Sequence, residues 1–283
     1  MLSVALAAVS GLVWGVGDFA GGKATQRAAA LPVAWLSKLV SLPLLAVYIG
    51  LTLVPVQPVS LLWGALAGTA GMVGLIIFYR ALSSGAMTVV APVTAVTSAC
   101  IPVVFGLARG EHPPPVRLAG VVCALVAIAL VSLSPTPAGQ VTVVTRRLVV
   151  MSVLSGACFA LFFILMATAG RVAGGSAGLW PSGAAQLAAL VLGGLLVLST
   201  RPRPWPTGGS LRWAVVAGPF DMTANALYLL ATRRGDLSIV APLAALYPVT
   251  TVILALLVDR ERLRVVQGVG LGLALAALVL VNR

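Results

Sequence analysis

The segment TVVAPVTAVTS, which runs from Thr88 to Ser98, returns 150 residues later as SIVAPLAALYP, from Ser238 to Pro248. Both copies are apolar, and both place an Ala-Pro pair at the same point. A recurrence of this kind indicates an internal repeat, in which the fold of one half predicts the fold of the other.

The repeat extends well beyond these two segments. Residues 60–131 align with residues 210–281 without a gap. The identical positions include residue types that chance rarely matches in an apolar chain, namely Trp63 and Trp213, Met72 and Met222, Pro92 and Pro242, and Glu111 and Glu261. Further upstream, SGLVWG from Ser10 corresponds to SGACFA from Ser155. The duplication therefore covers most of the chain.

The composition places the chain in a membrane. Of its 283 residues, 60% are hydrophobic and only 8% are charged, and its mean hydropathy is +1.10. Soluble domains carry about 25% charged residues. The net charge of +12 does not call for a nucleic-acid partner, because the basic residues stand mostly singly or in pairs at the ends of apolar stretches, where they orient membrane helices.

Ten apolar stretches are long enough to cross a hydrocarbon core of about 30 Å as helices. We expect them at residues 2–22, 30–54, 60–82, 86–108, 115–134, 146–170, 177–199, 211–232, 237–258 and 263–281. The first stretch has no basic leader, so it is expected to be a retained helix and not a signal peptide. The sequence predicts an all-α integral membrane protein.

The ten spans divide into two sets of five. We expect a first five-helix repeat at residues 1–134, a connecting loop at 135–145 and a second repeat at 146–283. Because five is odd, the second repeat enters the membrane from the opposite side, so the repeat is inverted. Two inverted halves can exchange conformations and open a central site to one side and then to the other, which is the geometry of alternating access.

The prolines of the two VAP segments are the candidate hinges. Pro92 and Pro242 lack the N–H that would bond to the carbonyl four residues back, so each loosens its helix a few residues inside the fourth or ninth span. Freed carbonyls are tolerated at membrane depth where they face protein or a water-filled cavity. The alternative is a simple packing kink, because proline is frequent in membrane helices.

Three Gly-x-x-x-Gly pairs predict close helix packing within the bundle. They are Gly11 and Gly15, Gly64 and Gly68, and Gly268 and Gly272.

These patterns resemble a known family. SGLVWGVGDFAGG from Ser10, YRALSSGAMTVVAPVTA from Tyr79 and LATRRGDLSIVAPLAALYP from Leu230 look like the two EamA domains of the drug/metabolite transporter superfamily. In both halves a late helix, an acidic loop and a glycine-containing helix follow one another. The resemblance implies a ten-helix secondary transporter, often an exporter of amino acids or other small metabolites, with both termini cytoplasmic.

Single positions carry the resemblance further. Lys38 matches a position where the family commonly has a basic residue early in its second helix, and Gln186 is its counterpart in the second copy. Asp18 departs from the family, which often has a neutral polar residue there. The implied orientation places more basic residues in the outside links than in the inside links, which is the reverse of the positive-inside rule, so the orientation stays open.

The eighth span carries the first candidate site. Asp221, Asn225 and Tyr228 follow one another at helical spacing, so that their polar tips share one face. Ionisable groups at membrane depth are costly and are kept for pairing or function. A carboxylate beside an amide and a phenol could hold a substrate ammonium or exchange a proton. A structural hydrogen-bonding role is the alternative.

The first two spans carry the second candidate site. Asp18 and Lys38 lie a few turns inside a short hairpin, at depths that can match. They can form a structural ion pair, or contribute directly to substrate binding or coupling, and Lys38 alone can extend to the interface. Trp14 and Tyr247 are expected either to line a cavity or to pack in the bundle. Glu111 and Glu261 occupy matched loops, where capping or an ion pair with a nearby Arg is expected.

The expected function is a secondary transporter in the plasma (inner) membrane. It would export a small polar metabolite, amino-acid-like in its chemistry, by alternating access without ATP hydrolysis. We expect no catalytic residue, no metal and no cofactor. The expected partners are a small-molecule substrate and the bilayer. The alternatives are a membrane enzyme acting on lipid and a passive channel or scaffold. The substrate, the direction of transport, the coupling ion and the oligomeric state remain open.

Overall fold

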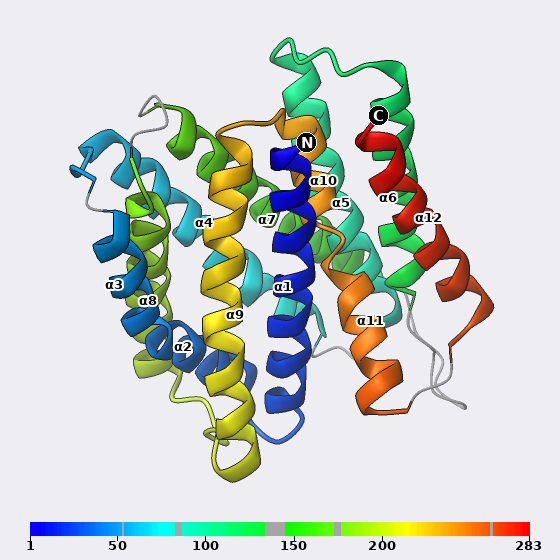
Figure 1. The fold of residues 1–283 in the computed structure, drawn as a ribbon. Coiled ribbons are helices and arrows are strands. Elements are labelled where there is room, and N and C mark those ends of the chain that lie inside the picture. The colour runs from blue at the N-terminus through cyan, green and yellow to red at the C-terminus, as the bar shows by residue number, and fades with distance from the viewer. Residues whose placement is uncertain (53, 83–86, 134–144, 173–176, 261–262) are drawn as a thin grey trace.

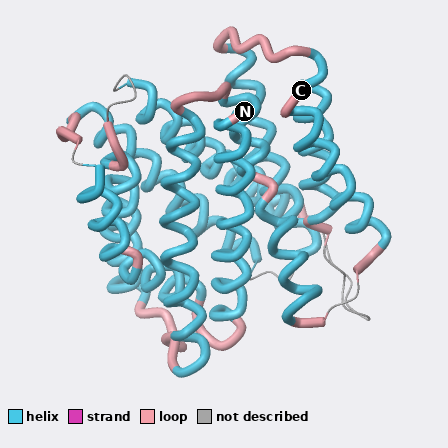
Figure 2. The backbone as a smooth tube through the Cα atoms, viewed as in Figure 1, coloured by secondary structure: helices cyan, strands magenta, loops and turns pink. Residues whose placement is uncertain are grey.

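A computed structural model describes residues 1–283 except 53, 83–86, 134–144, 173–176 and 261–262. Within the described residues the chain forms a bundle of helices without strands (Figures 1 and 2). Both termini lie at the same end of the bundle, the upper end in Figure 1. An even number of membrane crossings produces this arrangement.

The helices reproduce the ten predicted spans. In chain order they are α1 (Leu2–Thr25), α2 (Ala30–Val40), α3 (Leu42–Thr52), α4 (Pro58–Leu82), α5 (Met87–Ala108), α6 (Pro115–Val131), α7 (Arg146–Val172), α8 (Trp180–Thr200), α9 (Gly208–Thr232), α10 (Leu237–Ala244), α11 (Tyr247–Val258) and α12 (Val265–Val281). The second span is divided into α2 and α3, and the ninth into α10 and α11. The predicted fold class, an all-α membrane protein of ten spans in two inverted repeats, is confirmed.

Most spans are long enough to cross a bilayer. Eight are at least 18 residues long and apolar enough to cross it. The remaining two, α6 and α12, have 17 residues each, which is at the lower end of the spanning range. The predicted connecting loop at 135–145 lies, except for its last residue, outside the described residues.

Matched contacts relate the two halves. The Ser10 hydroxyl of α1 donates to the Ala224 carbonyl of α9 at 2.8 Å. At the equivalent point in the repeat, the Ser155 hydroxyl of α7 donates to the Gly74 carbonyl of α4 at 2.9 Å. Each first helix of a repeat therefore packs on the third helix of the other repeat, as a pseudo-twofold axis requires.

The last helices of the two repeats pair with each other on the same axis. A Cβ placed on Gly120 of α6 would lie 2.6 Å from Val281 Cγ2, and one placed on Gly270 of α12 would lie 2.7 Å from Val131 Cγ2. These two contacts are each other's equivalents in the repeat. Both are too short for any side chain larger than hydrogen, so these two glycines set how closely α6 and α12 approach.

The Gly-x-x-x-Gly predictions are correct at two of the three pairs. A Cβ on Gly11 would lie 2.9 Å from the Ala244 carbonyl oxygen, and Gly15 is equally crowded by α11. Gly64 and Gly68 of α4 face the backbone of α8 in the same way. The third pair was predicted wrongly: among the described residues, a Cβ built on Gly268 has only Leu263 within 4 Å, at 3.7 Å, and one built on Gly272 has no neighbour within that distance.

The ninth span breaks where two prolines act together. Pro242 lies inside α10 and Pro248 in the first turn of α11, and the helix is interrupted at Ala245 and Leu246 between them. Pro248 has no N–H to offer the Ala244 carbonyl, so the helical ladder ends there. The fourth span stays one helix although it contains two prolines, Pro92 and Pro102. Its position equivalent to Pro248 is Ser98, which keeps its N–H.

Candidate functional site

An ion pair joins α2 to α9 in the interior of the bundle. The Lys38 ammonium lies 2.5 Å from Asp221 Oδ2, and the two side chains are only 21% and 29% exposed. Lys38 stands in the last turn of α2, halfway along the second span, and Asp221 near the midpoint of α9. The pair therefore lies deep between the two ends of the bundle.

Tight packing between α2 and α9 positions this ion pair. The Ser37 hydroxyl lies 3.0 Å from the Ala214 carbonyl oxygen. Gly218 faces the Ser37 carbonyl so closely that a Cβ would overlap it. Because Ser37 precedes Lys38, this contact sets the height at which the ammonium reaches the Asp221 carboxylate.

The second repeat supports the backbone of Lys38. The span breaks after Val40, and the carbonyl of Lys38 accepts hydrogen bonds from the Ser41 hydroxyl at 2.8 Å and from Gln186 Nε2 at 2.9 Å. Gln186 also hydrogen-bonds the Ser41 hydroxyl. Gln186 is the counterpart of Lys38 in the repeat, so the two equivalent helices meet at this point.

Asn225 completes the coordination of the carboxylate. Its Nδ2 donates to the Asp221 carbonyl at 2.7 Å and to Oδ2 at 3.2 Å. Oδ2 therefore receives both the ammonium and the amide, while Oδ1 has no hydrogen-bond partner among the described residues. A free acceptor beside an ion pair can bind a donor from a substrate.

Asp18 lies on α1 next to this group. Its neighbour Gly17 packs against α9, where a built Cβ would be 3.4 Å from the Asp221 backbone nitrogen. The Asp18 carboxylate is within electrostatic range of Asp221, Lys38 and Tyr247. It is exposed, and in the described part of the chain it has no ion-pair or hydrogen-bond partner. Lys38 thus pairs with Asp221 and leaves Asp18 free; the Asp18–Lys38 pair considered from the sequence is not formed.

Trp14 and Tyr228 belong to an aromatic cluster. The Trp14 ring centroid lies 5.8 Å from that of Tyr228 and 5.6 Å from that of Phe163. Tyr228 is fully buried, and its hydroxyl donates to the Phe163 carbonyl at 3.0 Å. Tyr228 thus shares a helical face with Asp221 and Asn225, but in this conformation its hydroxyl is held by α7.

The candidate cavity residue Tyr247 and the two candidate hinge prolines lie at different structural positions. Tyr247 is the first residue of α11, directly after the break of the ninth span, and is half-buried. Pro242 is buried in α10, three residues before that break. Pro92 is half-buried in a continuous α5. The structure therefore puts a discontinuity beside Pro242, while the function of either proline as a hinge stays a prediction.

Two ion pairs connect helix ends, one at each end of the bundle. At the upper end in Figure 1, Arg171 of α7 lies 3.2 Å from Glu111 in the α5–α6 link. At the lower end, Lys23 of α1 pairs with Asp259, which follows α11. Both basic residues stand in the last turn of equivalent helices, so the basic members of the two ion pairs occupy matched places of the inverted repeat.

Glu111 also caps α10, which confirms the capping role expected from the sequence. Its two oxygens accept from the backbone nitrogens of Leu237 at 2.9 Å and Ser238 at 2.8 Å. Partial burial by itself would raise the pKa of Glu111, but these hydrogen bonds and Arg171 outweigh burial and leave the pKa below its usual range. Its counterpart Glu261 lies outside the described residues.

Sequence reasoning missed some of these contacts. It did not foresee the Lys23–Asp259 pair, although both residues lie at helix ends equivalent to those of Arg171 and Glu111. It also missed the hydrogen bond of 3.0 Å between the Tyr48 and Thr223 hydroxyls, which joins α3 to α9. The repeat matches Glu111 with Glu261 and not with Asp259, so the repeat by itself did not point to the first.

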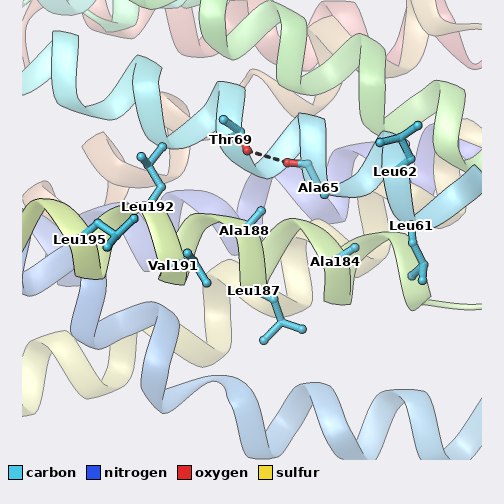
Figure 3. A pocket seen from close by; sticks show the side chains of 10 residues that line it. All are labelled: Leu61, Leu62, Ala65, Thr69, Ala184, Leu187, Ala188, Val191, Leu192 and Leu195. Carbon is cyan, nitrogen blue, oxygen red and sulfur yellow. Dashed lines mark hydrogen bonds between the residues drawn. The ribbon is translucent and has the colours of Figure 1, made fainter. Parts of the chain in front are cut away.

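A large apolar groove lies elsewhere, between α4 and α8 (Figure 3). Its volume is about 650 Å³. Among its lining residues only Thr69 has a polar side chain, and that hydroxyl donates to the Ala65 carbonyl at 2.9 Å. Leu187 and Val191 in its wall are 55% and 63% exposed. The groove offers a polar solute no binding group, and its exposed apolar wall suits lipid.

Comparison with known proteins identifies the second half of the chain. Residues 146–283 match the EamA-like transporter family. The second repeat is an EamA domain. The match confirms the family resemblance over residues 146–283, and the assignment of the first half to a further EamA-like repeat stays a prediction. EamA proteins are multi-pass membrane proteins and transporters.

The fold is also known from solved structures. One crystal structure, described only as that of a protein, superposes with a TM-score of 0.78 at 17% sequence identity, and the alignment covers 99% of this chain and 98% of the other. At this identity the likeness shows the fold alone. None of the curated proteins matches this chain.

Proposed function

We propose that this EamA protein is a secondary transporter of a small polar metabolite that carries an amino group, with amino acids as the leading class. The observation that carries the proposal is the group of charges within the spans, formed by Asp18, Lys38 and Asp221. Such groups cost about 2.5–3.5 kcal/mol each on insertion scales and are kept for pairing or function.

The charges of this group define the substrate chemistry. Two carboxylates and one ammonium leave one negative charge, and the unpaired carboxylate is that of Asp18. A substrate ammonium bound to Asp18 would neutralise the site, and a substrate carboxylate could compete for Lys38. A proton on Asp18 would neutralise it equally well. Binding of the amine and of the proton would then exclude each other, which couples their movements.

Alternating access supplies the movement. The inverted repeat gives the two halves equivalent contacts, and the ion pairs Lys23–Asp259 and Arg171–Glu111 join matched helix ends at opposite faces. We propose that one pair opens while the other holds. The direction of export and the plasma membrane location follow from the family resemblance. The process uses an ion or solute gradient and not ATP.

The test is counterflow in liposomes that contain the purified protein. Vesicles loaded with one unlabelled amino acid or amine are placed in the same labelled compound, and a panel is surveyed. We expect saturable uptake for at least one compound. Asp18→Asn and Asp221→Asn should abolish it, whereas Arg27→Gln, which removes an exposed charge in the α1–α2 link, should retain it.

The same assay distinguishes the rival functions. Flux that does not saturate and shows no counterflow would support a channel, and product formed from labelled lipid would support an enzyme. Full counterflow in both Asp→Asn variants would remove the charged group from the mechanism.

A further inference from the structure

A second cavity, with polar walls, lies at the end of the bundle where both termini are found. It has a volume of about 170 Å³ and lies between the first turns of α1 and α6 and the turn that joins α9 to α10. This is several times the roughly 30 Å³ that a water molecule occupies in the liquid. Its walls are polar around Arg117, Arg234 and Asp236, and apolar at Ile239 and Val240.

Two arginines in this cavity lack partners. Neither Arg117 nor Arg234 forms an ion pair among the described residues. The Arg117 Nε atom is shielded from solvent and has no hydrogen-bond partner in that part of the chain. The neighbouring Arg171 differs, because Glu111 and the Gly235 carbonyl engage it. A shielded, unpaired guanidinium nitrogen is costly unless a ligand completes its hydrogen bonds.

The position of the cavity identifies the kind of ligand. The first turns of α1 and α6 and the end of α9 are ends of membrane spans, so the cavity is level with the lipid headgroups. Guanidinium groups match the oxygens of a phosphate, to which they donate paired hydrogen bonds. The two arginines outnumber the one carboxylate in the walls, Asp236, so the cavity has a net positive charge that favours an anionic phosphodiester.

We propose that this cavity binds the phosphate group of an anionic membrane phospholipid. Arg117 and Arg234 hold the phosphate oxygens, Asp236 accepts from a headgroup hydroxyl, and Ile239 and Val240 contact the apolar part below. The bound lipid touches the first turn of α1 and the start of α10, the short segment before the break in the ninth span. This site does not depend on the transport activity proposed above.

The experiment measures thermal unfolding of the full-length protein in detergent, titrated with phosphatidylglycerol, phosphatidylcholine or inorganic phosphate. We expect phosphatidylglycerol to stabilise the parent at lower concentration than phosphatidylcholine. In Arg117→Gln/Arg234→Gln the affinity should fall about tenfold or more for each charged hydrogen-bonding partner lost. Arg109→Gln/Arg283→Gln removes two charges from the same face outside the cavity and should leave the affinity unchanged.

The arms of the experiment separate the outcomes. Stabilisation by phosphatidylglycerol alone supports a lipid headgroup, and stabilisation by inorganic phosphate that requires the same arginines supports a phosphate site filled from solution. The proposal would be overturned if phosphatidylglycerol stabilised Arg117→Gln/Arg234→Gln and the control Arg109→Gln/Arg283→Gln with equal affinity. If the Gln double variant does not fold, Arg117→Lys/Arg234→Lys retains the charge without the paired geometry; an affinity equal to the parent's would then overturn it.

Discussion

The Lys38–Asp221 ion pair makes an asymmetric prediction about stability. Lys38→Met leaves two carboxylates, Asp18 and Asp221, facing each other at membrane depth without a cation. Asp221→Asn leaves Lys38 beside Asp18, which can replace the lost partner. Breaking a buried ion pair costs about 3–5 kcal/mol. Because the two side chains are 21% and 29% exposed, we expect the lower end, about 3 kcal/mol, for Lys38→Met, and a smaller loss for Asp221→Asn.

The double variant Lys38→Met/Asp221→Asn tests the reasoning further. It leaves Asp18 as the single charge of the group, so the net charge equals that of the parent. The decrease in its free energy of unfolding should be smaller than the sum of the decreases in the two single variants, with a coupling free energy of roughly 2 kcal/mol.

The assay is unfolding of purified protein in mixed micelles by increasing SDS, followed by tryptophan fluorescence. Arg27→Gln serves as a surface control and should change the free energy of unfolding by less than about 0.5 kcal/mol. Two results would refute the reasoning. One is an Asp221→Asn loss as large as that of Lys38→Met, and the other is a double variant whose cost equals the sum of the singles.

Three further predictions concern the ends and the packing of the bundle. Hydrogen bonds keep the pKa of Glu111 below its usual range, so the stabilisation by its carboxylate is present at neutral pH and is lost as the pH falls through that lowered pKa. In Glu111→Gln the free energy of unfolding should therefore depend less on acidic pH than in the parent. An unchanged dependence would contradict the capping role. Gly270→Val should destabilise the protein by about 1–3 kcal/mol through overpacking, measured by SDS unfolding, while Gly272→Val, which faces open space, should not. Lys23→Asp and Asp259→Lys should each impair counterflow and the combined charge swap should restore it; failure of the swap to restore flux would exclude this ion pair as a gate.

Much of the fold was predictable from the sequence because the solvent imposes it. In a bilayer every backbone polar group must be satisfied within the segment, so a long apolar stretch has to become a helix. The ten stretches read from composition and the inversion read from the odd count of five are both present in the structure. Hydrogen bonds such as Ser10 to Ala224 and Ser155 to Gly74 show the same repeat at the level of single contacts.

The partners of the polar side chains were decided only by the tertiary structure. Local spacing put Asp221, Asn225 and Tyr228 on one helical face, but it could not show that α2 brings Lys38 to Asp221 or that α7 engages the Tyr228 hydroxyl. The choice depends on how closely helices approach, which Gly218 sets between α2 and α9.

The break in the ninth span shows the same division between sequence and structure. The sequence located the Ala-Pro pair in both halves and predicted equivalent hinges. Only one half breaks: the ninth span is interrupted between Pro242 and Pro248, whereas α5 stays continuous although it contains Pro92 and Pro102. Residue type and periodicity thus determined which segments are helices and on which face their polar groups lie, whereas interhelical packing decided which charges meet, since a pair forms only where two backbones come close enough.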